Sequence, residues 1–210
     1  MNFYSISQAL GEHYSLAFDS HGPSSEGVDW GTDQSAADLR NYNMLNVLKD
    51  RTSPSTLLDV GCGYGALGSI IKAENLPIEY YGVDVAKNMI DYAKNYFKSA
   101  DNFFCEDFLA WTPPRIYDYV VCNGILTQKL DASSLEMNHY SKQLIRKMFD
   151  ISSKGIAFNC MTSYVNFQKQ NLFYKSPVEM LSWCMEEITT QVRLDNSYRL
   201  WYEYTLYLYK

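Results

Sequence analysis

The chain has no cluster of basic residues and no long apolar run, and each of these absences excludes a class of protein. It carries 18 Lys and Arg against 24 Asp and Glu, a formal net charge of −6. Nucleic-acid binders neutralise several phosphates with Lys and Arg, so we expect no nucleic-acid partner. No stretch reaches the roughly 18 consecutive apolar residues of a membrane-spanning helix. Because the N-terminus also lacks a basic segment followed by an apolar one, we expect a cytoplasmic protein without a membrane partner.

Cysteine is present in a number and spacing that exclude two further classes. The five cysteines are odd in number and widely separated, at Cys62, Cys105, Cys122, Cys160 and Cys184. Neither a disulfide framework nor a zinc-binding spacing emerges from this pattern. We therefore expect free thiols in a reducing compartment and no metal site.

The stretch from Thr56 to Gly68 carries the strongest local signal. An apolar run ends in Asp59, glycines alternate from Gly61 to Gly65, and apolar residues with helical spacing follow. This order predicts a strand, a tight turn and a helix. Glycine permits positive φ at such a turn and lets a ligand approach the backbone closely. The stretch therefore indicates a site for a nucleotide-like ligand.

Two cofactors satisfy this glycine pattern. Gly63, Gly65 and Gly68 match the G-x-G-x-x-G fingerprint of dinucleotide-binding proteins, with Asp84 near the position of its acidic residue. This match leaves an NAD-dependent oxidoreductase as an alternative. Asp59, however, would lie beside the pyrophosphate and repel it, whereas a cation would be attracted. S-adenosylmethionine carries a sulfonium and an ammonium, no phosphate, and a ribose diol for Asp84, so we favour it.

The segment from Leu58 to Gly65 also resembles the cofactor motif of class I S-adenosylmethionine-dependent methyltransferases. The resemblance extends over residues 35–210, with acidic residues ending the first three strands and a hairpin closing the chain. It implies an α/β fold: a Rossmann-like, seven-stranded, mostly parallel sheet with an antiparallel last strand and helices on both faces. We expect a single domain over 1–210, with an N-terminal helical cap at 1–52 and the core at 53–210.

Apolar periodicity and turn residues place the expected elements along the chain. A loop rich in Gly, Pro and Ser is expected from His21 to Gly31. Helices are expected over residues 3–18, 35–49, 66–74, 85–98, 135–151 and 177–187. Strands are expected over residues 56–60, 80–84, 102–108, 118–126, 155–161, 188–194 and 199–208.

Candidate cofactor residues follow from the strand ends and from the resemblance. Asp84 ends a buried strand and suits the ribose hydroxyls, while the resemblance assigns Glu106 and Asp107 to the adenine, although Asp107 could instead cap a helix. Arg40 could bind the methionine carboxylate or lie in solvent. The complete set of expected cofactor contacts, with S-adenosylhomocysteine as product, is Trp30, Arg40, Asp59, Gly61, Cys62, Gly63, Gly65, Asp84, Val85, Met89, Glu106, Asp107, Phe108, Asn123 and Gly124.

The sequence says less about the methyl acceptor. Asn123 is followed by Gly124 and Ile125, whereas methyltransferases acting on base amines or glutamine amides carry two prolines and an aromatic residue there. Blocks such as His21-Gly22, Trp30-Gly31 and 157–159 resemble a bacterial subgroup with mostly unassigned substrates. We expect methylation of an oxygen or nitrogen of a small molecule, such as a sugar or another small metabolite. A non-catalytic S-adenosylmethionine-binding protein is the other alternative.

Three histidines limit the choice of a general base. His21, in the expected aromatic loop, is the first candidate and His139 the second, against the alternative that each is a packed or surface histidine. Tyr14, Tyr164 and Tyr174 are candidates for the acceptor pocket. We expect a monomer or a homodimer, the latter through exposed tyrosines of the last strand.

Overall fold

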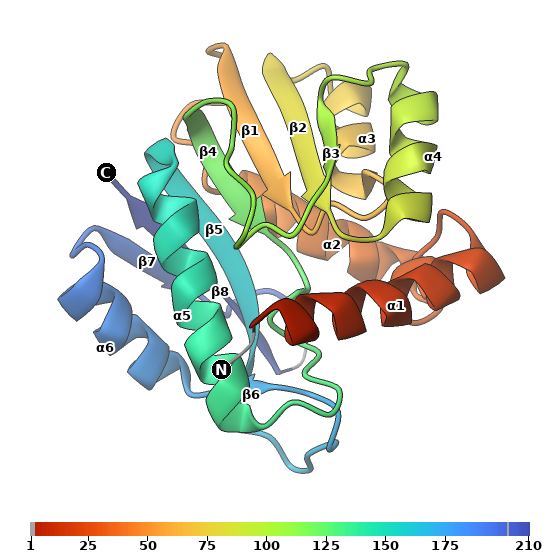
Figure 1. Ribbon diagram of the computed structural model, residues 1–210. Coiled ribbons are helices and arrows are strands. Elements are labelled where there is room, and N and C mark those ends of the chain that lie inside the picture. The colour runs from red at the N-terminus through yellow and green to blue at the C-terminus, as the bar shows by residue number, and fades with distance from the viewer. Residues whose placement is uncertain (1–2, 201) are drawn as a thin grey trace.

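The computed structural model describes residues 3–200 and 202–210, and a mostly parallel sheet forms its centre (Figure 1). The strand order is β3-β2-β1-β4-β5-β8-β7, and β6 pairs with β5 beside this path. Strand β8 is antiparallel to β5 and β7, whereas the pairs from β3 to β5 are parallel. The strands are β1 (Ser55–Val60), β2 (Ile78–Asp84), β3 (Phe103–Cys105), β4 (Tyr117–Cys122), β5 (Ser152–Thr162), β6 (Tyr174–Lys175), β7 (Val192–Asp195) and β8 (Glu203–Tyr209).

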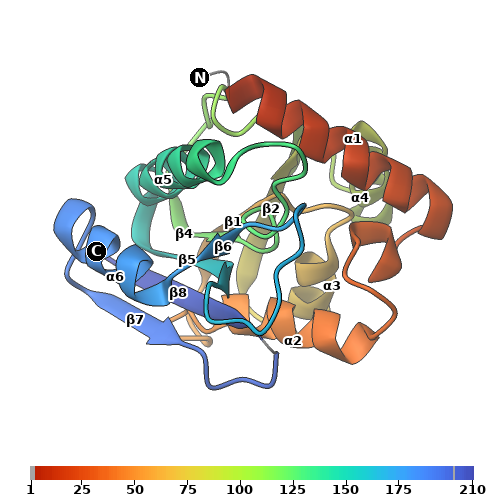
Figure 2. The ribbon, with the colours of Figure 1, turned by 90° about the horizontal axis from the view of Figure 1, so that it is seen from below.

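Helices cover both faces of this sheet, and α2 and α5 lie on opposite sides of the strands (Figure 2). Side chains of α2, α3 and α4 pack into one apolar cluster, and those of α1, α5 and α6 into another. The bounds are α1 (Phe3–His21), the short η1 (Glu26–Val28), α2 (Gln34–Leu45), α3 (Ala66–Ala73), α4 (Lys87–Phe97), α5 (Ser134–Asp150) and α6 (Pro177–Glu187). The predicted fold class is confirmed, with β6 as an additional short strand.

Two strands end earlier than predicted, and both ends lie beside the site described below. Strand β3 stops at Cys105 because Asp107 turns the chain, its Oδ1 accepting the Leu109 amide at 2.9 Å. Strand β4 stops at Cys122, and the Gly124 amide then donates to the Asn159 side chain at 2.8 Å. Beyond each strand a backbone amide thus donates to a side chain and not to the backbone of a neighbouring strand, so the pairing of the strands ends there.

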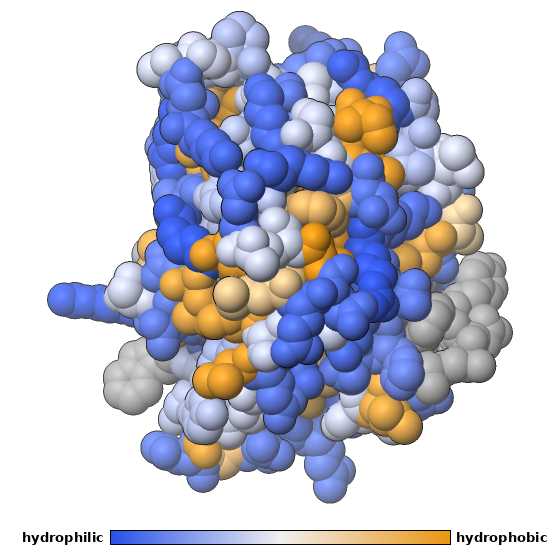
Figure 3. Space-filling view, turned by 90° about the vertical axis from the view of Figure 1, so that its left-hand side faces the viewer, coloured by the Kyte–Doolittle hydropathy of each residue, from blue (hydrophilic) through white to orange (hydrophobic). Residues whose placement is uncertain are grey.

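The last strand does not form an edge of the sheet. Strand β8 lies between β5 and β7, and its Tyr204 and Tyr207 are buried. The expectation that exposed tyrosines of this strand would support a dimer is therefore wrong. The edge at this end of the sheet is β7, whose Arg193 is exposed. The side of the molecule seen in Figure 3 mixes apolar and hydrophilic side chains. Charged residues at a sheet edge oppose pairing with another chain.

Helix α1 extends across the end of the sheet and is longer than predicted. It continues to His21, so this residue belongs to the last helical turn and not to the expected loop. Only glycine fits at position 11 of this helix, because a Cβ on Gly11 would lie 2.8 Å from Cγ2 of Val85 and would clash with it. The missing side chain lets α1 approach the residue after β2. No helix in the described part of the chain combines the length and apolar content needed to cross a membrane.

Truncating a buried side chain of α5 should measure how far the core depends on this helix. Leu144 is fully buried, whereas Leu135 on the same helix is 63% exposed. We expect Leu144→Ala to lower the free energy of unfolding by about 2–5 kcal/mol, through lost burial and the cavity left behind. Urea denaturation measures this change, with Leu135→Ala as the matched control. Equal effects of the two substitutions would contradict the assigned packing of α5.

Candidate functional site

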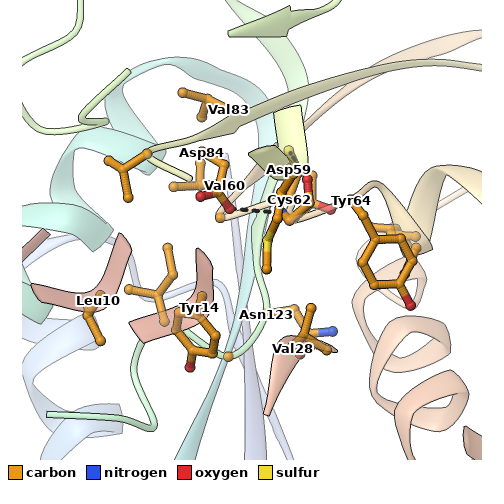
Figure 4. A pocket seen from close by; sticks show the side chains of 18 of the residues that line it. Leu10, Tyr14, Val28, Asp59, Val60, Cys62, Tyr64, Val83, Asp84 and Asn123 are labelled. Atoms are coloured by element: carbon orange, nitrogen blue, oxygen red, sulfur yellow. Dashed lines mark hydrogen bonds between the residues drawn. The ribbon is translucent and has the colours of Figure 1, made fainter. Parts of the chain in front are cut away.

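The carboxyl ends of β1, β2 and β4 open into a cavity of about 990 Å³, a volume that includes its mouth. Strand β1 continues to β2 on one side and has β4 as its neighbour on the other, so the direction in which the chain adds strands reverses between β1 and β4. Parallel sheets bind ligands at such a switch point. Leu10 and Tyr14 of α1 lie on one side of the hollow, with Val60 and Asp84 at the strand ends on the other (Figure 4). The hollow at this switch point is therefore the candidate ligand site.

The glycine loop after β1 forms one wall of the cavity. Gly61, Gly63 and Gly65 all have positive φ, at 74°, 54° and 87°, a conformation that favours glycine. The Gly61 amide donates to the Val83 carbonyl at 2.8 Å, and the Gly63 amide donates to Oδ2 of Asp84 at 2.8 Å. The loop is therefore joined to the end of β2 by backbone and side-chain contacts.

Asp84 holds its carboxylate at the cavity with two backbone donors. Besides the Gly63 amide, the Ala86 amide donates to Oδ1 at 2.8 Å. Burial raises the pKa of Asp84, and these two amides act against that rise. Each carboxylate oxygen can accept more than one hydrogen bond. The fixed carboxylate is therefore able to accept the two hydroxyls of a ribose diol.

Asp59, the next-to-last residue of β1, is a buried carboxyl group with only one of its two oxygens hydrogen-bonded. Its Oδ2 accepts the Tyr80 hydroxyl at 2.8 Å, but its Oδ1 has no hydrogen-bond partner. Burial, together with the charge of Asp84, raises the pKa of Asp59 to about 7 despite the Tyr80 hydrogen bond. A buried carboxylate is costly unless a positive charge lies near it. Asp59 therefore favours a cationic ligand in this cavity.

A second unsatisfied oxygen lies where β4 leaves the sheet. The Asn123 side chain donates to Oδ1 of Asn41 at 3.0 Å, while its own Oδ1 is buried without a partner. Both asparagines line the cavity. Since buried polar atoms are nearly always hydrogen-bonded in native proteins, two unsatisfied acceptors indicate a ligand that supplies donors.

The charges that line the cavity are all of one sign. Asp59, Asp84 and Glu106 contribute three carboxyl groups, and no Lys, Arg or His is among the described residues that line it. The rest of the lining is largely apolar, from residues such as Val28, Met89 and Phe108. A phosphorylated ligand would find no positive counter-charge in this lining. A cation with an apolar or aromatic body would find both negative charge and apolar surface.

Arg40 does not line the cavity but supports it through a buried network. Its Nε and terminal nitrogen donate to Glu203 at 2.9 and 2.6 Å, and the Asn159 amide also donates to Glu203, at 3.2 Å. Arg40 also lies over the ring of Trp30, 5.3 Å from its centre. Trp30 in turn packs so closely on Gly124 that a Cβ there would lie 3.0 Å from the ring. Glu203 therefore holds the guanidinium of Arg40, and the contact of Arg40 with a ligand carboxylate stays a prediction.

The structure brings most of the predicted cofactor residues together around the cavity. Those that line it are Trp30, Asp59, Gly61, Cys62, Gly63, Asp84, Val85, Met89, Glu106, Phe108, Asn123 and Gly124, together with Tyr14. The predicted residues outside the lining are Arg40, Gly65, Asp107, His21, His139, Tyr164 and Tyr174. His21, His139 and Tyr164 are exposed. The roles assigned to all these residues stay predictions.

Apart from Tyr14, sequence reasoning missed the helical side of the cavity. Further lining residues come from α1, α2 and α5, among them Ser7, Leu10, Gly11, Gln34, Ala37, Asn41 and Tyr140. One signal was available in α1, since the small residues Ser7 and Gly11 interrupt an apolar stripe at helical spacing. No local signal marks Asn41 or Tyr140, whose burial depends on contacts distant in sequence.

The third histidine, His13, belongs to a polar chain that holds α1 in place. Its Nε2 lies 2.9 Å from Oδ2 of Asp29, which also accepts the Gln128 amide at 2.8 Å. Gln128 accepts the Asn171 amide at 2.9 Å. Four segments distant in sequence therefore meet beside the cavity. His13 itself is not among the residues that line it.

Comparison with known proteins agrees with the geometry of the site. The profile of a family described as "Methyltransferase domain" matches residues 58–143. A Mycobacterium tuberculosis (strain ATCC 25618 / H37Rv) protein provisionally named methyltransferase Rv1506c is 31% identical over 161 residues, which are 75% of this chain and 94% of the relative.

Two solved structures share the fold. The DhpI complex with SAH has a TM-score of 0.61 and 15% identity, covering 97% of this chain and 96% of that one. The S-adenosylmethionine-dependent methyltransferase SibL in its apo form has a TM-score of 0.65 and 15% identity, covering 94% of this chain and 61% of that one. At these identities the two structures show the likeness of fold alone.

Removing one partner of the half-buried Arg40–Glu203 pair should destabilise the protein. We expect Glu203→Gln to lower the free energy of unfolding by about 1–3 kcal/mol, because the half-buried Arg40 loses its counter-charge. The double variant Arg40→Met, Glu203→Leu should recover most of this loss, as measured by urea denaturation. As a control, Glu179→Gln in the surface pair with Lys175 should leave the midpoint unchanged. A Glu203→Gln variant as stable as this control would contradict the network.

Proposed function

Because the chain belongs to the class I S-adenosylmethionine-dependent methyltransferases, we propose that it methylates an oxygen or nitrogen atom of a small molecule. The net charge of −6 and the cavity without Lys, Arg or His support a small-molecule acceptor over a nucleic acid. Likeness of fold alone would not carry this proposal, since one fold hosts many activities. The residues of the site have to carry it.

The observation that carries the proposal is the match between the cavity and a cation. Three carboxyl groups line it, and Oδ1 of both Asp59 and Asn123 is buried without a partner. S-adenosylmethionine supplies positive charge on its sulfonium and donors on its ammonium, and it carries no phosphate. Such a ligand would satisfy both oxygens and lower the cost of burying Asp59.

We assign the parts of the cofactor to the predicted residues that line the cavity. Asp84, held by two backbone amides, would accept the ribose hydroxyls. Asn123, with the glycine loop and Trp30, would hold the methionine portion, with Asp59 nearby as counter-charge. The adenine would lie among the remaining predicted residues of the lining, which are Val85, Met89, Glu106 and Phe108.

The chain's own contribution to the reaction is to hold two reactants in line and to exclude water. When bound, the cofactor would supply a methyl group and would keep the carbon–sulfur electron pair on sulfur. A lone pair of the acceptor would form the new bond, and the acceptor's proton would leave to bulk water when the product is released. Helix α1 covers the cavity, and the network around Trp30 holds the opposite wall. Correct positioning can account for much of the acceleration of such a displacement. A base role for His21 or His139 would require either side chain to reach the cavity lining, which neither does here.

The same observations weigh against the two alternatives. NAD would place a pyrophosphate beside Asp59 without any Lys or Arg in the described lining. A non-catalytic binding protein would share the cofactor contacts, so only transfer of the methyl group separates it from an enzyme. Within this function we propose a single domain, because Ile6 and Leu10 of the N-terminal cap pack into the same core cluster as Leu144 of α5.

Ligand binding and methyl transfer test the proposal together. We expect S-adenosylmethionine and S-adenosylhomocysteine to raise the melting temperature and NAD to leave it unchanged. At 100 times its dissociation constant a ligand adds about 2.7 kcal/mol of stability. Asp84→Asn should weaken this effect, and Asn in place of the exposed Asp101 serves as the matched control. Labelled methyl groups should then reach hydroxyl- or amine-bearing small molecules and no nucleic acid. Stabilisation by NAD alone would refute the proposal, and binding without any transfer would favour the non-catalytic alternative.

The pKa of Asp59 predicts how cofactor affinity depends on pH. The ionised carboxylate attracts the cation and the protonated form does not, so binding below about pH 7 must release a proton. We expect the dissociation constant of S-adenosylmethionine to rise as pH falls below about 7, by up to about tenfold per pH unit. Calorimetry in buffers of different ionisation enthalpy would detect the proton. Asp59→Asn should flatten the profile, whereas Asp91→Asn on the exposed face of α4 should retain it. A wild-type profile as flat as that of Asp59→Asn would exclude the assignment.

A further inference from the structure

The assigned cofactor contacts leave several lining residues uncovered, among them Gln34, Ala37 and Asn41 of α2 and a wall formed mainly by α1. This wall faces the strand ends and consists of Ser7, Leu10, Gly11 and Tyr14 from α1, with Tyr140 on α5. Leu10 and Tyr14 lie across the hollow from Val60 and Asp84 in Figure 4. An acceptor that lies beside the cofactor therefore contacts this wall, which we call the helical wall.

The helical wall carries no formal charge. Its ionisable groups are the phenols of Tyr14 and Tyr140, and burial raises the pKa of both above the ordinary value, so both stay neutral. An acceptor carboxylate or phosphate would have no positive partner there and would face the carboxyl groups of Asp59 and Asp84. An amine held as its ammonium would have no lone pair with which to accept the methyl group.

The helical wall also offers few hydrogen bonds. Its side-chain polar atoms are three hydroxyls, and those of Ser7 and Tyr140 lie 3.4 Å from each other. Leu10 supplies apolar surface. A sugar has a hydroxyl on almost every carbon, and each one buried without a partner costs about 1–3 kcal/mol. The wall therefore suits an acceptor with one or two polar groups on an apolar body.

We propose that the acceptor is a small, uncharged and largely apolar molecule that carries the methylated oxygen or nitrogen as one of few polar groups. This inference rests on the proposed function, because it assigns the strand-end side of the cavity to the cofactor. It narrows the acceptors expected from the sequence, since a free sugar fits the helical wall poorly. It also excludes acceptors whose buried portion carries a phosphate or a carboxylate.

Binding of matched probes to the protein loaded with S-adenosylhomocysteine tests the inference without requiring turnover. Suitable probes are 4-ethylphenol, 4-hydroxybenzoate, tyramine and methyl β-glucopyranoside, which are respectively apolar and uncharged, anionic, cationic and rich in hydroxyls. Titration calorimetry should show 4-ethylphenol binding at least about tenfold more tightly than each of the others, a difference of about 1.4 kcal/mol. Equal binding of the four, tighter binding of a charged probe or the sugar, or no binding at all would overturn the inference.

Two pairs of variants locate the probe in the cavity. Ser7→Lys places a positive charge in the helical wall and should reverse the preference toward 4-hydroxybenzoate, while Ser5→Lys, at an exposed residue of the same helix, should not. Leu10→Trp should fill the space and abolish 4-ethylphenol binding with affinity for S-adenosylhomocysteine kept, and Leu16→Trp on the exposed side of α1 should change neither. Unchanged probe binding in both cavity variants would place the probe elsewhere and overturn the inference.

Affinity for S-adenosylhomocysteine is measured first in every variant. Its absence from the wild-type protein would refute the proposed function itself. Normal affinity with a different ranking of the probes would refute only the class of acceptor inferred here.

Discussion

The hydrogen bond from the Gly63 amide to Asp84 is the contact on which the rest of the site depends. It joins the loop after β1 to the end of β2 and holds the loop in a backbone conformation that favours glycine. Asp84 is thereby presented to the cavity in a fixed orientation, beside the buried Asp59. The two carboxyl groups make the strand ends negative, which selects a cationic ligand and disfavours a phosphorylated one.

The opposite end of the chain supports this arrangement from behind. Glu203, the first residue of the last strand, pairs with Arg40 of α2, and Asn159 of β5 links Glu203 to the backbone at Gly124. Trp30 lies between Arg40 and Gly124 and lines the cavity. The antiparallel strand that closes the sheet is therefore also connected to the site. Its position between β5 and β7 is what brings Glu203 within reach of α2.

Sequence reasoning was most successful where a residue's role depends on its immediate neighbours. The glycine loop, Asp59 and Asp84 follow apolar strands directly, so their convergence at one edge of a parallel sheet was predictable. It was least successful where a side chain meets a partner distant in sequence. Arg40 lies 163 residues from Glu203, and nothing local distinguishes it from an arginine that binds a carboxylate ligand. His21 was placed in a loop because Gly22 and Pro23 follow it, although the helix continues through it.

The sequence by itself determined the cofactor loop and the sign of the charge at the strand ends, because both follow from residue types at short spacing, and its resemblance to a known family implied the fold class. Only the tertiary structure decided which side chains form the helical wall, since α1 and α5 meet over the cavity through contacts between Ser7 and Tyr140. It also decided that Arg40 supports the site from outside, and that Asn123 leaves an unsatisfied oxygen inside it. Hydrogen-bond satisfaction is a property of the packed interior, which local sequence patterns do not contain.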